Sequence, residues 1–313
     1  EISACLVGSE MCIRDSNVSN AIGIEIEDDF TKMIRARDNG EQWAQDMLDS
    51  MFQRNEPDIY ERIAEARRKI YAKDAESGNP KAMYYYGISA LDFNTFMRML
   101  EPLANRGNID AMTSIAREYS IGLLTEANAE QSFKWYLKAA QSGDVFAQNQ
   151  VALAYTCNNG CGGIDYNKAY EWYHAAAEQQ SASGYCGMGK CYEYWQTQLS
   201  FTSNGQDINE KLLDYDGKRV HCYEEARKYL SSQDEEIETL YGLGTSYRSA
   251  GEHVVNESAS IQMKKLAIFY FYAAYDCGHP HALKYAREIA ENNKIYVDFN
   301  NMMGWARSEG IIE

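Results

Sequence analysis

The sequence contains no long apolar run and very little proline. No stretch of 18 or more apolar residues occurs anywhere in its 313 residues. A helix that crosses a bilayer needs about 20 such residues, so no membrane-spanning helix is expected. With 45% hydrophobic residues and only 4 prolines, the chain can bury a sizeable interior. This length fits one elongated domain as well as two globular ones.

The sequence has fewer basic than acidic residues. Lysine and arginine number 30 against 46 aspartates and glutamates, which gives a formal net charge of -16. A phosphate backbone or an anionic bilayer attracts basic surfaces and repels acidic ones. Nucleic acid and membrane insertion are therefore excluded as expected partners. A basic peptide or protein face fits the charge better, and solubility alone explains it equally well.

Signatures of catalysis are absent as well. The sequence has no G-x-S-x-G and no H-E-x-x-H. The glycine-rich segments 184–190 (GYCGMGK) and 242–247 (GLGTSY) complete neither phosphate-binding pattern, and both lie inside predicted helices rather than after a strand. No pair of carboxylates can be assigned to acid and base roles. We therefore predict no catalytic residue and no cofactor.

Cysteine and histidine show no regular metal-ligand spacing. Cys157 and Cys161 flank a glycine turn, which leaves a metal site, a disulfide and two free thiols as alternatives; the irregular spacing favours free thiols. Cys277, His279 and His281 form a compact C-x-H-x-H, but segment 278–282 (GHPHA) aligns with 78–82 (GNPKA) as a turn into a helix, so we predict no metal there. No partner is evident for the remaining histidines, which are His174, His221 and His253.

What the sequence does contain is a repeat, clearest over residues 143–179. Its first half places small and apolar residues on one side of a helix, and its second half does the same at spacings of 3 and 4. A glycine-rich turn joins the halves, with Asp165 positioned to cap the second helix. The unit is therefore a helical hairpin, which must stack on neighbouring copies to bury its apolar stripe.

Further copies are marked by a glycine followed four residues later by alanine. Five copies keep both markers: Gly40 with Ala44, Gly78 with Ala82, Gly107 with Ala111, Gly143 with Ala147, and Gly278 with Ala282. One degenerate copy has Gln180 in the glycine position and Gly184 in the alanine position, and another, around Leu243, keeps only the end of the pattern. Intervals of 29 to 38 residues are typical of solenoids built from helix pairs.

The copy at 143–177 resembles the Sel-one-like repeat (SLR), a relative of the tetratricopeptide repeat with a longer internal loop. The resemblance rests on the glycine turn and on Asp165, Lys168, Trp172 and Tyr173. It implies an all-α solenoid, a right-handed superhelix of stacked antiparallel helix pairs. The 29-residue step departs from the family pattern, and Pro102 is expected to kink or end its predicted helix.

The repeats suggest the domain organisation. Residues 1–20 show no period and resemble adapter-derived sequence, with a signal peptide as the competing interpretation. We predict Sel-one-like repeats over 21–195, an insertion loop over 196–218 with turn formers near its middle, and further repeats over 219–313. Unpaired cysteines favour a cytoplasmic location, and a secreted or periplasmic one remains the alternative if the leader is incomplete.

In tetratricopeptide-like superhelices the first helix of each pair lines the concave surface. Helical periodicity places offsets 3, 6, 7 and 10 from the marker glycine away from the buried stripe. Aromatic, amide and charged groups at such positions suit peptide recognition, although ordinary solvated surface explains them equally well. The predicted protein-binding residues are Tyr84, Tyr85, Arg117, Asn149, Gln150 and Lys190.

These features predict a non-enzymatic scaffold that binds a protein or peptide in its concave groove. One alternative is an enzyme or binding protein for cell-wall peptide or a β-lactam, as the resemblance to secreted family members implies. Paired cysteines in each repeat and an export signal would favour that alternative. A third interpretation is an accessory subunit that uses its convex face in a larger assembly.

Overall fold

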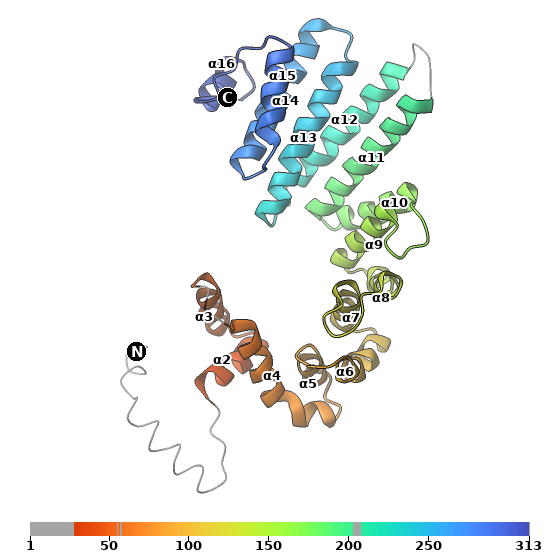
Figure 1. The fold of residues 1–313 in the computed structure, drawn as a ribbon, viewed down its shortest axis with the longest axis vertical. Helices are drawn as coiled ribbons and strands as arrows, with labels where there is room; N and C mark the ends of the chain where they lie inside the picture. The colour runs from red at the N-terminus through yellow and green to blue at the C-terminus, as the bar shows by residue number, and fades with distance from the viewer. Residues whose placement is uncertain (1–27, 55, 57, 203–207, 313) are drawn as a thin grey trace, which may run out of the picture. The chain divides into compact units, whose positions relative to one another are not determined.

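The computed structural model describes residues 28–54, 56, 58–202 and 208–312, and within these ranges all regular structure is helical (Figure 1). The predicted fold class, an all-α solenoid, is confirmed. The predicted leader, 1–20, lies outside the described residues. The helices are α2 (Asp29–Asp38), α3 (Gln42–Gln53), α4 (Ile59–Glu76), α5 (Pro80–Gly87), α6 (Phe93–Asn105), α7 (Ile109–Ile121), α8 (Ala129–Gln141), α9 (Val145–Cys157), α10 (Tyr166–Glu178), α11 (Ala182–Thr202), α12 (Ile208–Ala226), α13 (Gln233–His253), α14 (Glu257–Asp276), α15 (Ala282–Asn292) and α16 (Met302–Ser308).

The chain divides into two compact units, residues 1–114 and 115–313, with the boundary inside α7. In unit 1, α2 packs on α3 and α4, and α4, α5 and α6 pack in succession. In unit 2, each helix from α8 to α14 packs on the next one in the chain, and α11 also touches α9 and α13. Consecutive helix pairs therefore stack within unit 2, as a helical repeat requires.

The marker glycines occupy equivalent bends. Gly40, Gly78, Gly107, Gly143 and Gly278 all have positive φ, between 86° and 114°. Residues with a Cβ rarely adopt this region, which is why glycine recurs at the bend. Gln180 also has a positive φ, 64°, so the degenerate copy keeps the bend without the glycine. The alignment of Gln180 with the glycines is therefore confirmed.

A side-chain cap explains the alanine marker. In three copies an asparagine or aspartate follows the glycine, and its side-chain oxygen accepts a hydrogen bond from the N–H of the alanine. The distances are 3.1 Å from Ala82 to Asn79, 2.7 Å from Ala111 to Asn108 and 2.7 Å from Ala147 to Asp144. Each alanine is buried, because a neighbouring helix passes close to it. The predicted cap at Asp165 is also formed, with the N–H groups of Asn167 and Lys168 as donors.

Glycines inside α11 and α13 serve as contact points for aromatic rings. A Cβ placed on Gly187 would lie 2.3 Å from the Tyr173 ring, and one on Gly242 would lie 2.3 Å from the Tyr223 ring. Gly244 meets the Phe271 ring in the same way, at 2.8 Å. The glycine-rich segments thus allow close packing between helices, which agrees with the expectation that they are not phosphate loops.

The prediction of a loop over 196–218 is wrong for most of its length. Helix α11 continues to Thr202, and α12 begins at Ile208. The turn formers near Ser203 had suggested an insertion, but buried polar groups at Gln196 and Asp216 bond across the two helices and hold both in the stack. Residues 203–207 lie outside the described residues.

Pro102 was expected to kink or end its helix, and it does not end it. Helix α6 contains Pro102 and continues to Asn105. The proline lies on the exposed side, whereas the next two residues, Leu103 and Ala104, are buried. Burial of those side chains holds the last turn in helical form despite the donor that proline lacks.

Candidate functional site

The first helices of successive pairs in unit 2 are α9, α11 and α13. The part of α7 from residue 115 to its end also belongs to unit 2 and precedes them in the chain. Helix α11 contacts both α9 and α13, which places these three helices side by side. The exposed side of α7 and α9 carries Arg117, Phe146, Asn149, Gln150 and Leu153, and we call this surface the first-helix face. It is the surface on which the sequence predicted recognition.

Arg117 is exposed and lies over an aromatic ring. Its guanidinium carbon is 5.7 Å from the centroid of Phe146, and Phe146 in turn meets the ring of Tyr136 edge-on at 6.0 Å. Burial raises the pKa of the Tyr136 hydroxyl, and Arg117 opposes that shift. The arrangement presents a cation and an apolar ring side by side on the surface of adjacent repeats.

Asn149 and Gln150 are half-buried on α9. The Nδ2 of Asn149 donates to the Oγ of Ser181 at 3.0 Å, a contact between successive repeats. Its Oδ1 is buried and has no hydrogen-bond partner among the described residues. A buried acceptor without a partner is costly to the stability of the free chain.

Lys190 is on α11 and is exposed, but it is paired. Its Nζ lies 2.5 Å from Oε1 of Glu238 on α13. Ser183, two helical turns earlier on α11, donates to Oε1 of Glu235 at 2.7 Å. Lys190 therefore links two first helices, and a ligand that bound it would have to compete with Glu238.

In unit 1, Tyr84 and Tyr85 differ in their surroundings. The ring of Tyr85 stacks on Tyr71 at 5.2 Å, and its hydroxyl donates to the carbonyl oxygen of Asp38 at 3.3 Å. The guanidinium carbon of Arg67, which forms a bidentate pair with Asp38, lies 4.8 Å from the same ring. Burial raises the pKa of Tyr85. Tyr85 thus contributes to packing between α2, α4 and α5, and the ring of Tyr84 meets it edge-on at 5.5 Å.

The structure brings Arg117, Asn149 and Gln150 onto one surface of unit 2 and joins Lys190 to α13. Cys186 and Gly187 on α11 have the same repeat offsets, 6 and 7, as Asn149 and Gln150 on α9. Both are buried, although these offsets predict exposure. The tight fit of Gly187 against the Tyr173 ring explains this difference. The helical period alone therefore does not define the first-helix face in α11.

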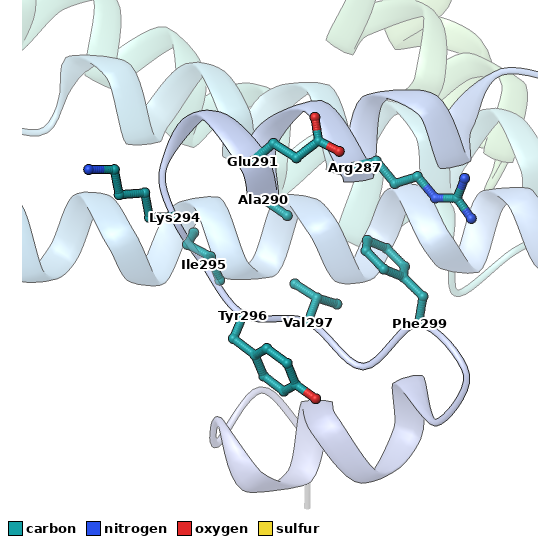
Figure 2. A pocket seen from close by; sticks show the side chains of 8 residues that line it. All are labelled: Arg287, Ala290, Glu291, Lys294, Ile295, Tyr296, Val297 and Phe299. Atoms are coloured by element: carbon teal, nitrogen blue, oxygen red, sulfur yellow. The ribbon is translucent and has the colours of Figure 1, made fainter.

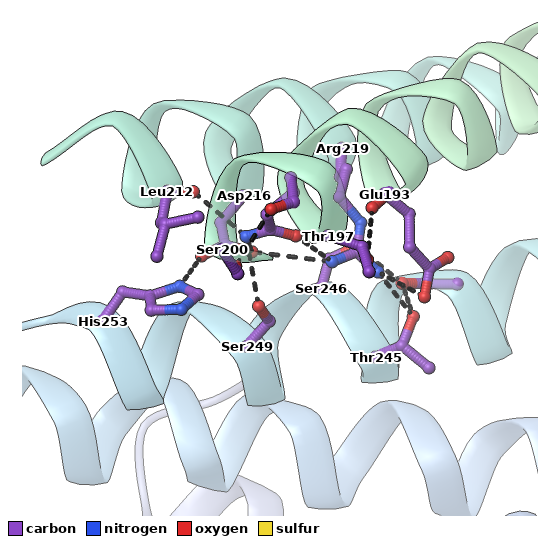
Figure 3. Close-up of polar contacts among 12 residues, drawn as sticks. Glu193, Thr197, Ser200, Leu212, Asp216, Arg219, Thr245, Ser246, Ser249 and His253 are labelled. Carbon is purple, nitrogen blue, oxygen red and sulfur yellow. Dashed lines mark hydrogen bonds and ion pairs between the residues drawn. The ribbon is translucent and has the colours of Figure 1, made fainter. Parts of the chain in front are cut away.

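A buried polar cluster joins α11, α12 and α13, and the sequence did not reveal it (Figure 3). Nδ1 of His253 lies 2.6 Å from Oδ2 of Asp216, although His253 had no identifiable partner in the sequence. Nε2 of Gln196 donates to Oδ1 of Asp216 at 2.7 Å, and Arg219 donates to Oε1 of Gln196 at 2.9 Å. Both charged groups, Asp216 and Arg219, are almost fully buried.

The Arg219 side chain also contacts two residues outside Asp216 and Gln196, which are Glu193 and Thr245. Its guanidinium lies 3.6 Å from Glu193 Oε1 and donates to Thr245 Oγ1 at 3.2 Å, while its Nε has no partner among the described residues. Within the described residues this cluster holds the second helix α12 against two first helices. No local sequence signal indicates it, because its members come from three helices.

The cysteines are free thiols in the described residues. Cys157 is exposed and Cys161 is half-buried, and each thiol donates a hydrogen bond to a backbone carbonyl oxygen of α9. Burial raises the pKa of Cys186, Cys191 and Cys222 to about 12. In the described part of the chain, no three metal-ligating side chains gather in one place.

A shallow pocket of about 360 Å³ lies where the chain leaves α15 (Figure 2). Arg287 and Glu291 of α15 line one side, Lys294 follows in the turn after the helix, and Val297 and Phe299 line the side formed by the connection to α16. The Arg287 guanidinium carbon lies 5.7 Å from the Phe299 ring. This pocket mixes apolar walls with charge of both signs.

The sequence profile of the Sel1 repeat matches residues 109–144, 145–181 and 264–279. The second match coincides with the clearest copy of the repeat. No protein with a curated description matches the chain significantly. No helix in the described ranges has the length and apolar character needed to cross a bilayer.

Two solved structures are similar to this chain. The crystal structure of a Sel1 repeat protein from Oxalobacter formigenes shares 17% identity, covers 86% of this chain and 99% of its own, and superposes with a TM-score of 0.49. The crystal structure of a protective antigen of uropathogenic Escherichia coli, which displays an SLR fold, also shares 17% identity. It covers 93% of this chain and 74% of its own, with a TM-score of 0.38.

Proposed function

This chain is a helical repeat protein of the Sel1-like (SLR) family, and on that premise we propose that its first-helix face binds a peptide or protein partner. Sel1 repeats generally act as scaffolds for protein interaction rather than as enzymes. The observation that carries the proposal is the grouping of Arg117, Phe146 and Asn149. An exposed cation lies over an exposed ring, and Asn149, half-buried on the same helix as Phe146, borders the pair.

Each of these groups suits a different part of a peptide. The Phe146 ring offers apolar area, and the Arg117 guanidinium donates to a carboxylate or carbonyl oxygen. Gln150 adds a second amide next to Asn149. Tyr85 is not an anchor in this proposal, because its hydroxyl and ring are already engaged by Asp38 and Tyr71.

We further infer that the partner carries positive charge elsewhere on its surface. The net charge of -16 creates a field that speeds the encounter with a basic protein and slows the encounter with an acidic one. Such steering acts mainly on the association rate and weakens with salt. Capture yields should therefore fall as ionic strength rises.

Affinity capture from the native cell, with quantitative mass spectrometry, tests this function. We expect the triple variant Arg117→Ala, Asn149→Ala, Gln150→Ala to lose about tenfold or more of the captured partner, since anchor residues typically contribute about 2 kcal/mol or more each. The control variant Lys134→Ala, Glu171→Ala, His174→Ala changes three side chains on the outer sides of the second helices α8 and α10. Equal capture by both variants and the wild type would refute the assignment of the face.

A further inference from the structure

Helix α3 of unit 1 exposes two large apolar side chains next to each other. Trp43 and Met47 keep 51% and 50% of their surface exposed. They lie four residues apart, so their side chains are neighbours on one side of the helix. The residues that α3 buries are Ala44, Leu48 and Met51. Trp43 and Met47 therefore lie outside the core of unit 1.

The repeat gives this pair the same position in its hairpin as part of the first-helix face. Helix α3 follows the bend at Gly40, and Trp43 and Met47 stand 3 and 7 residues after that glycine. Phe146 and Gln150 have the same offsets on α9. Unit 1 thus has its own exposed apolar group on the first helix of a pair.

The indole of Trp43 is held in place and left uncovered. Its Nε1 donates a hydrogen bond to Oε2 of Glu41 at 2.7 Å. In the described part of the chain, no other ring and no cation lies against the indole. A side chain that is already held loses less conformational entropy when a partner binds, so binding at this ring costs less.

The charged side chains of α3 are all negative. Residues 41–53 contain Glu41, Asp46 and Asp49, all exposed, and no lysine, arginine or histidine. Asp46 and Asp49 each accept a hydrogen bond at 2.8 Å from a glutamine amide of the same helix. None of the three carboxylates forms an ion pair within the described residues. Their negative charge is therefore not balanced locally.

The next helix, α4, shows the more usual arrangement. Its Glu61 pairs with Arg68 at 2.9 Å, and its Glu65 pairs with Lys69 at 2.8 Å. Acidic residues on an exposed helix of unit 1 are thus paired where cations are supplied in the same helix. Helix α3 supplies none.

Two arginines contact α3 without balancing its charges. Nε of Arg37 donates to Oε1 of Gln45 at 3.1 Å. Two residues turn a helix by about 200°, so Gln45 lies on nearly the opposite side from Trp43. Arg54 follows the helix and pairs with Glu56 at 3.2 Å. The surface around the indole therefore combines apolar area with uncompensated negative charge.

From these contacts we propose that the α3 face, formed by Trp43, Met47, Glu41, Asp46 and Asp49, binds a basic segment of a partner protein that carries a large apolar side chain. The apolar side chain packs on the flexible Met47 and beside the indole. Lysine or arginine next to it meets the carboxylates and the indole, since tryptophan is the best aromatic acceptor for a cation. The site lies in unit 1 and is independent of the first-helix face.

Charge favours a basic partner over the other possible occupants of this face. Residues 1–27 contain five acidic residues and one arginine, so they do not supply the complementary charge. A second copy that docked through the same face would bring like charges together. The net charge of -16 also repels an anionic bilayer.

Synthetic peptides and the full chain provide the test, with binding measured by fluorescence anisotropy. The first peptide is short, labelled and composed of lysine and leucine. A second has glutamate in place of lysine, and a third has serine in place of leucine. Because a lysine-rich peptide associates loosely with any acidic surface, the informative quantity is the affinity that changes at α3 remove.

One variant removes the apolar side chains and has a matched control. The apolar variant carries Trp43→Ser and Met47→Ser. Its control carries Phe146→Ser and Leu153→Ser on α9, whose side chains are 44% and 48% exposed. The control changes equally exposed apolar residues outside the α3 face.

A second variant removes charge without changing shape. The charge variant carries Asp46→Asn and Asp49→Asn. Its control carries Glu101→Gln and Glu171→Gln, exposed carboxylates on α6 and α10 that form no ion pair within the described residues. Both change the net charge by the same amount.

We expect the wild type and both controls to bind the lysine and leucine peptide equally, within about twofold. The apolar variant should bind it about tenfold more weakly, and the serine peptide should bind the wild type about tenfold more weakly, the scale of losing an anchor. The charge variant should bind about threefold to tenfold more weakly at low salt, and the difference should narrow as salt rises. The glutamate peptide should not bind. Circular dichroism should report the same thermal midpoint for all variants, because the changed side chains are exposed.

Several results would overturn the proposal. They are no binding by the wild type, undiminished binding by the apolar variant, and a charge variant that behaves like its control. Self-association that the apolar variant loses would identify a second copy as the occupant, and sedimentation with phosphatidylcholine vesicles that it loses would identify a membrane. Because one control changes Phe146, failure of the first-helix face is measured separately from failure of the α3 face.

Discussion

The ring of Tyr173 lies directly against Gly187, so that a Cβ added at position 187 would come within 2.3 Å of the ring carbons. Tyr173 belongs to the second helix of one pair and Gly187 to the first helix of the next. Their contact therefore sets how closely two repeats approach. It also makes position 187 one where glycine stabilises a helix that would ordinarily prefer alanine.

We predict that Gly187→Ala destabilises the chain by about 2 kcal/mol, because overpacking of a tight contact outweighs the helix propensity of alanine. Gly217, on α12, serves as the control, since a Cβ added there would have no atom within 4 Å. Gly217→Ala should stabilise by about 0.5–1 kcal/mol. Urea unfolding followed by circular dichroism measures both, and a stabilising Gly187→Ala would contradict the packing.

Replacing Gln180 with glycine should stabilise the chain. Its φ of 64° lies in the left-handed region that glycine occupies at the same place in five other copies. Gln180→Gly should therefore increase the free energy of unfolding by about 1 kcal/mol, the strain of a side chain in that region. Gln179, with a φ of -95°, is the control, and Gln179→Gly should bring no gain. Equal effects at both positions would show that the bend is not strained.

The buried cluster predicts a large loss of stability when Asp216 is replaced. Asp216→Ala would leave the buried guanidinium of Arg219 without the buried carboxylate beside it and should cost about 3–5 kcal/mol. Asp214, two residues earlier, forms an exposed pair with Lys218 at 2.7 Å. Asp214→Ala should cost no more than about 0.5 kcal/mol. Thermal and urea unfolding would report the contrast, and similar losses at both positions would contradict the role of burial.

Thiol reactivity should follow burial. Because burial raises the pKa of Cys186, Cys191 and Cys222 to about 12, these thiols stay protonated at pH values near 8, about where an ordinary thiol ionises. Iodoacetamide should therefore label the exposed Cys157 first in the native chain and all of them in urea. Peptide mapping by mass spectrometry gives the order, and rapid native labelling of Cys186 would be inconsistent with its buried position.

The repeat was predictable because its signals are local. A positive φ at Gly143, a capping oxygen at Asp144 and a small residue at Ala147 all act within five residues, so they can be recognised without knowing the neighbours. The same holds for the cap at Asp165. Even Gln180 could be placed in the bend, since its position in the repeat is fixed by the copies on either side.

The candidate site was less predictable, because the partners of its residues are distant in the chain. Whether Tyr85 is free or engaged depends on Asp38, 47 residues away, and His253 meets Asp216 across 37 residues. The sequence also predicts too little helix in α11 and α12. The turn formers near Ser203 are a local signal, whereas the cluster around Asp216 that holds the two helices together joins residues far apart in the chain.

The amino-acid sequence by itself determined the helix pair, its period and the bend that joins successive pairs. The bend and the helix pair depend on backbone conformation and on spacings of a few residues, and the period follows because these local signals recur along the chain. Only the tertiary structure decided which faces of those helices are covered and which charges are paired. Such properties arise from stacking, in which each side chain's environment is supplied by residues one or two repeats away.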